Sequence, residues 1–401
     1  MGLSLGNSVK VVKCVKQNYD APAELLFVME QFRGMVNRAI TVGLERNITS
    51  RFKLRSAVYS ELHNGLHTHY IYGAVEKATA ILKNYRKALR KANAKGKTVR
   101  MPYVCKAFLS LDNQSYRIID GVLRVPIQPR QFIKIPLNSH TVEVLSQPNL
   151  KLGSVTMTAF TLVIAFSKEI DTIEPDGYMG IDRNLDNITM ADTEGNVEVI
   201  NLHDATLAKQ QYRETVSHLK RNDVRIRRKI AGKHGRIEKE RVKRILHNAS
   251  KFVVDYARER NMAIVMEDIK GIRKLYQKGN GQGRQYRGRM ASWSYYELQR
   301  QIEYKAQWEG LPVIYVKAGG TSSKCSVCGD KLFVEEGRMM YCVKCHRRID
   351  RDMNASINIL NRGVRFAPVG PAGEAMKGNP VVSYAPKVIP GADAGQLHVT
   401  R

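Results

Sequence analysis

Two Cys-x-x-Cys pairs near the C-terminus constrain the fold of this chain more than any other feature. Cys325 and Cys328 form the first pair, Cys342 and Cys345 form the second, and residues 329–341 separate them. Each pair can offer two thiolates to one tetrahedral ion, and an intervening segment of this length suits a β-hairpin. The pattern predicts a structural zinc site, which we place on a ribbon at 321–349. Four unrelated core cysteines are the alternative, and the paired spacing disfavours it.

The predicted zinc site has no open position for catalysis, because four sulfur ligands complete a tetrahedron. Gly329 stands where a Cys-x-x-Cys knuckle needs a turn without a Cβ, and Gly337 stands where the hairpin must reverse. His346 could replace one sulfur ligand, although four cysteines make that unnecessary.

A helix is predicted directly after the ribbon. Met353, Ile357 and Leu360 form an apolar stripe at helical spacing. Asp352 therefore falls in the first helical turn, where the helix dipole favours an anion and the side chain can face a cation. Taken alone, Asp352 is better interpreted as a helix cap than as a metal ligand.

Basic residues greatly outnumber acidic ones. The 401 residues include 65 Lys and Arg against 37 Asp and Glu, a formal net charge of +28. This imbalance favours a polyanionic partner, nucleic acid before an anionic membrane. No apolar run approaches the roughly 20 residues of a membrane-spanning helix, and the N-terminus has no signal-peptide pattern. We expect a cytoplasmic protein without a membrane partner, in which Cys14 and Cys105 are ordinary thiols.

The first part of the chain predicts β-structure interrupted by helices. A strand at 9–15 precedes a helical, basic segment at 21–104, and β-texture resumes from 108 to 168 with a two-residue hairpin turn at Asp120-Gly121. The order suggests a β-barrel of residues 1–20 and 105–175 with the helical segment inserted. Proline and acidic residues at 169–177 are typical of a linker.

The second part predicts an α/β domain over 176–320 and 350–362. Three short strands, the first ending at Asp182, form a meander of the kind that begins an RNase H-like domain. A basic helical pair at 205–260, broken at 232–235, precedes a buried strand that ends at Glu267 and Asp268. A glycine-rich basic loop with tyrosines covers 271–290. Residues 363–401 lack periodicity and are predicted to be a mostly disordered tail.

Asp182, Glu267 and Asp352 lie at the ends of buried strands or at the start of a helix. Hard divalent ions prefer rigidly held anionic oxygens, and phosphodiester hydrolysis uses two such ions roughly 4 Å apart. One Mg²⁺ would activate the attacking water and the other would stabilise the leaving 3′ oxygen. We expect these acids to converge on one two-metal site.

Four motifs, in this order, resemble the RuvC-like nuclease core of the TnpB family, which is encoded by prokaryotic insertion sequences and related to type V CRISPR effectors. They are Gly-Ile-Asp182-Arg-Asn-Leu, Val-Met-Glu267-Asp-Ile, Thr321-Ser-Ser-Lys-Cys-Ser-Val-Cys-Gly and Asp350-Arg-Asp352-Met-Asn-Ala-Ser-Ile-Asn-Ile-Leu. The resemblance implies Asp182, Glu267 and Asp352 as catalytic triad and the four cysteines as zinc ligands. Asp268 and Asp350 stay outside the predicted site. Ser356 stands where the family usually has alanine.

The resemblance further implies a wedge β-barrel with an inserted helical recognition domain, followed by the RuvC-like domain with its zinc ribbon. It implies an RNA-guided DNA endonuclease that carries a guide RNA from the transposon end and cuts double-stranded DNA beside a short motif. We expect a monomer within the ribonucleoprotein, associated with the nucleoid when bound to DNA.

Three other functions remain open from the sequence. The first is a nuclease-dead, RNA-guided repressor, which the intact motif acids disfavour. The second is an RNA-independent, structure-specific nuclease such as a junction resolvase, which would not need so large a basic N-terminal part. The third is a zinc-ribbon DNA-binding factor, for which three well-placed carboxylates would have no role.

Overall fold

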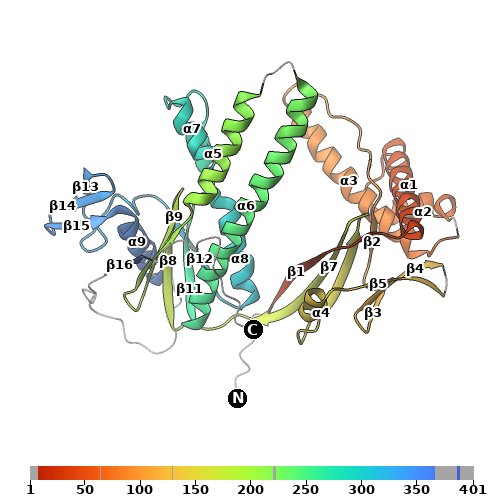
Figure 1. Cartoon of the computed structure of the whole chain (residues 1–401), viewed down its shortest axis with the longest axis horizontal. Coiled ribbons are helices and arrows are strands. Elements are labelled where there is room, and N and C mark those ends of the chain that lie inside the picture. The colour runs from red at the N-terminus through yellow and green to blue at the C-terminus, as the bar shows by residue number, and fades with distance from the viewer. Residues whose placement is uncertain (1–7, 64, 129, 220–222, 366–385, 389–401) are drawn as a thin grey trace. The chain divides into compact units, whose positions relative to one another are not determined.

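The computed structural model describes residues 8–63, 65–128, 130–219, 223–365 and 386–388 (Figure 1). The chain divides into two compact units. Lys10–Glu169 form one, here called the N-terminal unit, and Met1–Val9 with Ile170–Arg401 form the other, the C-terminal unit. The division falls at the start of the segment predicted as a linker.

Three helices in the N-terminal unit pack through their apolar faces. They are α1 (Ala23–Glu45), α2 (Arg51–Leu62) and α3 (His69–Asn93). Phe32 of α1 is fully buried, and its ring meets the edges of the rings of Tyr70 and Phe108 at 6.3 and 5.2 Å between centroids. The sequence analysis missed α2, because only Leu54, Val58 and Leu62 are buried along it and the apolar periodicity is correspondingly weak.

The strands of the N-terminal unit form two antiparallel sheets. One has the order β1-β7-β6-β2 and the other the order β3-β4-β5. The hairpin predicted at Asp120-Gly121 is confirmed, with φ of 51° and 70° at its two turn residues. The predicted closed barrel stays a prediction, since the described strands are hydrogen-bonded in two separate sheets. Their bounds are β1 (Ser8–Asn18), β2 (Leu109–Leu111), β3 (Arg117–Ile119), β4 (Val122–Gln128), β5 (Gln131–Pro136), β6 (Lys151–Met157) and β7 (Thr161–Asp171), with helix α4 (Ser139–Leu145) after β5.

A six-stranded sheet of order β12-β11-β8-β9-β10-β16 organises the C-terminal unit. The predicted meander β8-β9-β10 is confirmed as antiparallel, and β11 and β12 continue the sheet in parallel with β8. The strands are β8 (Gly177–Arg183), β9 (Asn187–Asp192), β10 (Val197–Asn201), β11 (Met262–Asp268), β12 (Val313–Lys317) and β16 (Pro386–Val388).

The predicted disordered tail needs correction at two places. The helix α9 (Arg351–Arg365) continues beyond residue 362, and β16 within the predicted tail pairs in parallel with β10. Pairing with an exposed sheet edge orders a short segment without apolar periodicity, so composition did not reveal it. The rest of the predicted tail lies outside the described residues.

Each face of the six-stranded sheet is covered by different helices. On one face Met179, Ile181 and Met266 pack with residues of α6 (Val224–Glu259) and α8 (Tyr295–Trp308). On the other face Val265 packs with Ile359 of α9. Gly180 allows this helix to come close, because a Cβ there would lie 2.4 Å from both the Leu360 nitrogen and the Ser356 carbonyl oxygen.

The helical pair of the C-terminal unit breaks earlier than predicted. Helix α5 (His203–His218) ends well before Gly232, and α6 runs uninterrupted through Gly232 and Gly235. Asp223 caps α6 by accepting a hydrogen bond from the Ile226 nitrogen at 3.2 Å. At Gly235 a Cβ would lie 3.2–3.3 Å from the Tyr212 ring and hydroxyl, so this glycine serves close packing rather than a break. No helix in the described ranges is long and apolar enough to cross a membrane.

The zinc ribbon prediction matches a three-stranded sheet of order β13-β14-β15. Its strands are β13 (Leu332–Glu336), β14 (Met339–Cys342) and β15 (Arg347–Asp350). Gly337 turns the predicted hairpin with φ 55°, and Gly329 turns the first knuckle with φ 77°. The predicted loop at 271–290 contains a short 3₁₀ helix, η1 (Ile272–Tyr276), and most of α7 (Arg284–Ala291).

Candidate functional site

The predicted acids Asp182 and Glu267 extend from one face of neighbouring strands. The parallel register pairs Met266 of β11 with Ile181 of β8, and each acid is the next residue along its strand. Ile181 and Met266 face α6 and α8, so alternation along the strands turns both acids to the side of α9. Asp182 is only 9% exposed.

Asp352 lies in the first turn of α9 as predicted, but it does not cap the helix. The side chain of Asp350 accepts hydrogen bonds from the backbone nitrogens of Asp352 and Met353 at 2.8 and 3.0 Å. Asp350 therefore satisfies the helix N-terminus, and the carboxylate of Asp352, 4% exposed, is available for other contacts. The interpretation of Asp352 as a helix cap is therefore wrong, and its role as a metal ligand stays a prediction.

Two asparagines connect Asp182 to Asp352. The side-chain nitrogen of Asn184 donates to Asp182 at 2.8 Å and to the side-chain oxygen of Asn187 at 3.1 Å. Asn187 in turn donates to Asp352 at 3.3 Å. This chain of amides shows that the first and last acids face a common space, although 170 positions separate them in the sequence.

The electrostatics agree with this convergence. Burial and repulsion from Glu267 and Asp352 raise the pKa of Asp182 to about 7. Burial also raises the pKa of Glu267, and this shift is opposed by a hydrogen bond from Thr321 and by the charges of Arg183 and Arg362. Buried carboxylates that repel one another favour the binding of a cation, which compensates their negative charge.

Three residues that the sequence analysis did not select contact the site. The hydroxyl of Thr321 donates to the Glu267 carboxylate, Arg183 donates to the Glu267 carbonyl oxygen at 2.5 Å, and Arg338 forms an ion pair with Asp352. Arg183 and Thr321 belong to the motifs that carried the resemblance, so their position beside an acid was a usable signal. Arg338 lies at the hairpin turn outside any of these motifs, so the sequence gave no signal of its contact with Asp352.

The donor set suits divalent ions, although the carboxylates do not form a tight cage. Among the residues that the structure describes, only the four cysteines bring three or more ligating atoms within 4.8 Å of one another. Two ions about 4 Å apart need a wider arrangement of oxygens than a single ion does. Buried, mutually repelling carboxylates fit Mg²⁺ chemically, since hard cations prefer anionic oxygen ligands.

The four predicted cysteines gather at one point. The sulfur of Cys325 lies 4.0 Å from that of Cys345, and the sulfur of Cys328 lies 3.5 Å from that of Cys342. Tetrahedral zinc with bonds of about 2.3 Å places sulfur atoms about 3.8 Å apart, so the spacing fits zinc. His346 is not part of this group; its ring contacts the Tyr341 hydroxyl at 3.2 Å.

Asparagine side chains of α9 form hydrogen bonds with the start of the ribbon. Asn354 accepts from the Ser326 nitrogen at 2.8 Å and donates to the Lys324 carbonyl at 2.8 Å. Asn358 donates to the carbonyls of Thr321 and Lys324 at 2.8 and 2.7 Å. The first knuckle, the Thr321 that contacts Glu267 and the start of α9 are therefore one connected structure.

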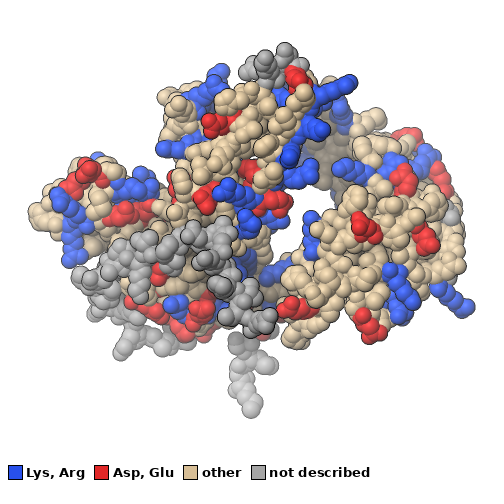
Figure 2. Space-filling view, in the orientation of Figure 1, with Lys and Arg blue, Asp and Glu red and all other residues tan. Residues whose placement is uncertain are grey.

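A basic surface covers the N-terminal half of α6. Figure 2 shows Lys and Arg gathered over this end of the helix. The acids in residues 224–244 are Glu238 and Glu240 only. Within the described ranges none of the exposed cations forms an ion pair, so this surface can receive phosphates. The exposed cations are Arg225, Arg228, Lys229, Lys233, Arg236, Lys239, Lys243 and Arg244.

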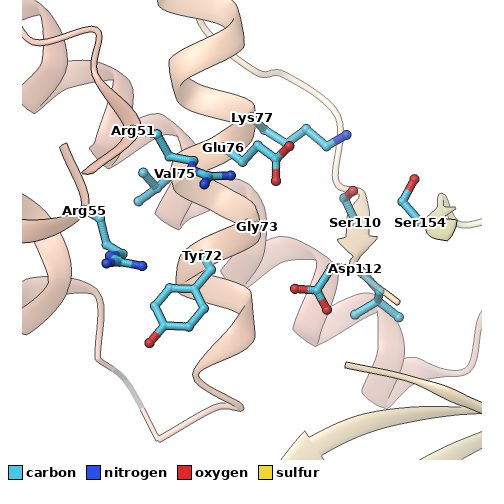
Figure 3. Close-up of a pocket in the computed structure, with 11 residues that line it drawn as sticks. Arg51, Arg55, Tyr72, Gly73, Val75, Glu76, Lys77, Ser110, Asp112 and Ser154 are labelled. Carbon is cyan, nitrogen blue, oxygen red and sulfur yellow. The ribbon is translucent and has the colours of Figure 1, made fainter. Parts of the chain in front are cut away.

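The N-terminal unit contains a pocket of about 280 Å³ between α2, α3 and β2 (Figure 3). Arg51, Arg55 and Lys77 supply positive charge, and the Arg55 guanidinium lies 5.1 Å from the centre of the Tyr72 ring. Asp112 and Ser110 line the opposite wall and offer hydrogen-bonding oxygens. Cations, a ring and acceptors in one pocket suit a nucleotide. Arg86 of α3 is engaged within the unit, since it donates hydrogen bonds to Asn47 and Thr49.

Comparison with known proteins identifies the family. The TnpB-like protein MJ0751 of Methanocaldococcus jannaschii is 31% identical over 253 residues, which cover 60% of this chain and 90% of that protein. The chain belongs to the TnpB-like family. A second member, MJ1635 of the same organism, is 24% identical over 305 residues, covering 74% of this chain and 69% of the relative.

Further similarities fall on the same segments. The family model of the Cas12f1-like TNB domain matches residues 295–359, and that of the uncharacterized MJ0013 family matches residues 28–126. The CRISPR-associated endodeoxyribonuclease Cas12f1 of Sulfoacidibacillus thermotolerans is 33% identical over 119 residues, 28% of this chain and 25% of that protein. The solved Cas12f1–sgRNA–target DNA complex matches with TM-score 0.50 and 12% identity, covering 85% of this chain and 83% of the other. The fold is thus that of this α/β nuclease group.

Proposed function

We propose that this TnpB-like protein is an RNA-guided DNA endonuclease that uses Asp182, Glu267 and Asp352 to hold two Mg²⁺ ions. The observation that supports the proposal is that Asn184 and Asn187 link Asp182 to Asp352 by hydrogen bonds and that Glu267 and Asp352 repel the Asp182 carboxylate. Related Cas12f1 proteins are named endodeoxyribonucleases, and one is solved with guide RNA and target DNA. The general role extends to this chain through its family, and the residue roles are our assignment.

The chain's own residues would act by binding and orienting. Bound Mg²⁺ would supply Lewis-acid activation of a water and stabilisation of the leaving 3′ oxygen. Asp182 and Glu267 would hold the ions from the rigid strand ends, and Asp352 from the first turn of α9. Thr321 and Asn187 would keep the acids in position through their hydrogen bonds to Glu267 and Asp352.

The nucleic-acid partners would lie on the two basic features. The exposed cations of α6 would contact phosphates of the guide RNA or its heteroduplex with the target strand. The pocket lined by Arg51, Arg55 and Tyr72 would take a nucleotide of the DNA. In this assignment residues 1–20 and 105–175 are the wedge barrel, 21–104 the recognition domain, 176–320 and 350–362 the RuvC-like domain, and 321–349 the zinc ribbon. A guide RNA from the transposon end and a monomeric ribonucleoprotein remain part of the proposal.

The test begins with the protein purified from a host that expresses it with its flanking transposon sequence. Sequencing should find one discrete copurifying RNA, and the complex should cut matching double-stranded DNA when Mg²⁺ is present. Asp182→Ala, Glu267→Ala and Asp352→Ala should each abolish cutting while guided DNA binding persists. Asp268→Ala is the matched control, because Asp268 is an exposed neighbour that pairs with Lys270.

The outcomes separate the proposed function from its rivals. Protein that carries no discrete RNA would exclude guided function and favour a structure-specific nuclease. Wild-type protein that binds guided targets without cutting them would instead support the repressor. Full cutting by any of the three acid variants would refute the assigned triad.

A further inference from the structure

Arg183 is a buried cation directly beside the proposed metal site. It is the last residue of β8 and follows Asp182, but alternation along the strand turns its side chain to the opposite face, toward α8. Only 4% of the residue is exposed. A buried guanidinium is costly unless its donors are used, so its contacts indicate what it does.

The hydrogen bonds of Arg183 go to neutral acceptors. One terminal nitrogen donates to the Glu267 carbonyl oxygen at 2.5 Å, and the other donates to the side-chain oxygen of Gln299 at 2.7 Å. The guanidinium therefore forms no ion pair with a carboxylate in the described structure. Its charge instead acts on the acids nearby, and it lowers the pKa of both Asp182 and Glu267 against the effect of burial.

The contact with Glu267 lies where β8 stops pairing with β11, and from this residue on only β12 pairs with the strand. The pairing of β8 with β11 ends at Met266, one residue before Glu267. The Arg183 side chain donates to the carbonyl oxygen of Glu267, the residue whose carboxylate is the proposed metal ligand. It thereby fixes the backbone from which one proposed metal ligand projects.

Gln299 extends this restraint to two further elements. Its side-chain nitrogen donates to the Tyr315 hydroxyl of β12 at 3.0 Å, and Tyr315 donates to Glu303 of α8. Gln299 uses both ends of its amide, so the network has a defined direction from Arg183 to Glu303. Strands β8, β11 and β12 and helix α8 are held together behind the acids.

We infer that Arg183 is a positioning residue that sets divalent-metal affinity by holding Glu267 from behind the sheet. The inference rests on the proposed function, since it needs the acids to be metal ligands. Residues that orient metal ligands typically contribute about 10–100-fold to metal affinity or activity. Arg183 does not contact the reacting atoms, so its effect should appear in metal binding and not in guided DNA binding.

The experiment measures Mn²⁺ binding to the purified ribonucleoprotein by electron paramagnetic resonance, together with the Mg²⁺ dependence of cleavage. Arg183→Gln should weaken Mn²⁺ binding about 10–100-fold, and the Mg²⁺ needed for half-maximal cleavage should rise similarly. Arg183→Lys should recover part of the loss, because one ammonium can still donate to the Glu267 carbonyl. Arg300→Gln is the matched control: Arg300 is an exposed arginine of α8 paired with Glu297, and this variant should bind Mn²⁺ as the wild type does.

Variants at Gln299 keep the inference testable if Arg183→Gln fails to fold. Gln299→Met removes one acceptor of Arg183 and should weaken Mn²⁺ binding less than Arg183→Gln does. Gln299→Glu restores an acceptor and should bind more tightly than Gln299→Met. Wild-type affinity in a folded Arg183→Gln, or in Gln299→Met, would overturn the role of Arg183. Absence of Mn²⁺ binding by the wild type, with binding equally absent in Asp182→Ala, would overturn the proposed metal site itself.

Discussion

Arg338, at the turn of the ribbon hairpin, forms an ion pair with Asp352 in the first turn of α9. The other carboxylate oxygen of Asp352 accepts a hydrogen bond from Asn187. Both oxygens of this proposed metal ligand are therefore engaged by the protein. A divalent ion that binds Asp352 has to compete with Arg338 for it.

Replacing Arg338 should therefore tighten metal binding. The Arg338 side chain is 53% exposed, so its ion pair contributes little, and Arg338→Met should raise Mg²⁺ affinity about 2- to 5-fold. Calorimetric titration of the RNA complex with Mg²⁺ measures this. Arg348→Met is the control, because Arg348 pairs with Glu335 on the same ribbon, away from the acids. Weaker Mg²⁺ binding by Arg338→Met would show that the arginine supports the site instead.

Gly180→Ala should damage the site without altering any polar group. A Cβ at this position would meet the backbone of α9 at 2.4 Å, so the helix that carries Asp352 has to move. Overpacking of this kind costs about 1–3 kcal/mol, and we expect a lower melting temperature together with reduced cleavage.

Gly232→Ala is the matched control for that substitution. Gly232 lies in α6 and is exposed, and a Cβ there meets nothing within 4 Å. Alanine should stabilise the helix by about 0.5–1 kcal/mol and leave cleavage unchanged. Equal melting temperatures for Gly180→Ala and wild type would contradict the close packing of β8 on α9.

The sequence allowed the strand ends and the cysteine pairs to be predicted, because both depend on local patterns. Short apolar runs located β8 and β11, and paired cysteine spacing located the ribbon. Local patterns did not distinguish Asp350 from Asp352, since both acids precede the apolar stripe. Only the structure shows that Asp350 accepts hydrogen bonds from the free backbone nitrogens and that the Asp352 side chain does not cap the helix.

Other features depend on partners far away in the sequence. Gly235 suggested a helix break, but α6 continues through it, and the missing side chain leaves room for Tyr212 of α5. Arg338 stands in a hairpin without any motif, and its contact with Asp352 depends on how the ribbon folds against α9. Arg183 was visible in the motif, but its acceptors lie on β11 and α8, and sequence order does not bring those together.

The raised pKa of Asp182 predicts a pH-dependent stability of the metal-free protein. Because the folded pKa, about 7, exceeds that of the unfolded chain, folded Asp182 keeps its proton between about pH 4 and pH 7 while the unfolded chain loses it. The free energy of unfolding should fall as pH rises through this window and level off above it. Asp182→Asn should abolish this slope and be more stable at pH 8 in EDTA, by on the order of 4 kcal/mol at most.

Urea denaturation from pH 4.5 to pH 8 measures this difference. Asp268→Asn is the control, because that carboxylate is exposed and pairs with Lys270. Added Mg²⁺ should stabilise the wild type and not Asp182→Asn, because ligand binding to the folded state alone raises stability. A wild type whose stability does not change with pH relative to Asp182→Asn would show that Asp182 is ionised throughout.

Loss of the structural zinc should weaken Mg²⁺ binding even though the zinc ligands do not touch the acids. Cys325→Ser should remove the bound zinc and lower the melting temperature, because the ribbon's small core consists mainly of its cysteines with Leu332 and Met340. The first knuckle is bonded to Asn354 and Asn358 of α9, and the same segment supplies Thr321 to Glu267. Losing this support should weaken Mg²⁺ binding about 10-fold or more.

The Cys325→Ser variant should change Mg²⁺ affinity in two opposite ways, and the larger change decides the result. Unfolding the ribbon also frees Asp352 from Arg338, but that gain is only about 2- to 5-fold, smaller than the expected loss of ligand positioning. Cys105→Ser is the control, since Cys105 is an exposed free thiol, and it should change neither zinc content nor Mg²⁺ affinity. Zinc analysis by mass spectrometry and Mg²⁺ titration of both variants test this. Tighter Mg²⁺ binding by zinc-free Cys325→Ser would mean that the ribbon acts mainly by holding Arg338 on Asp352.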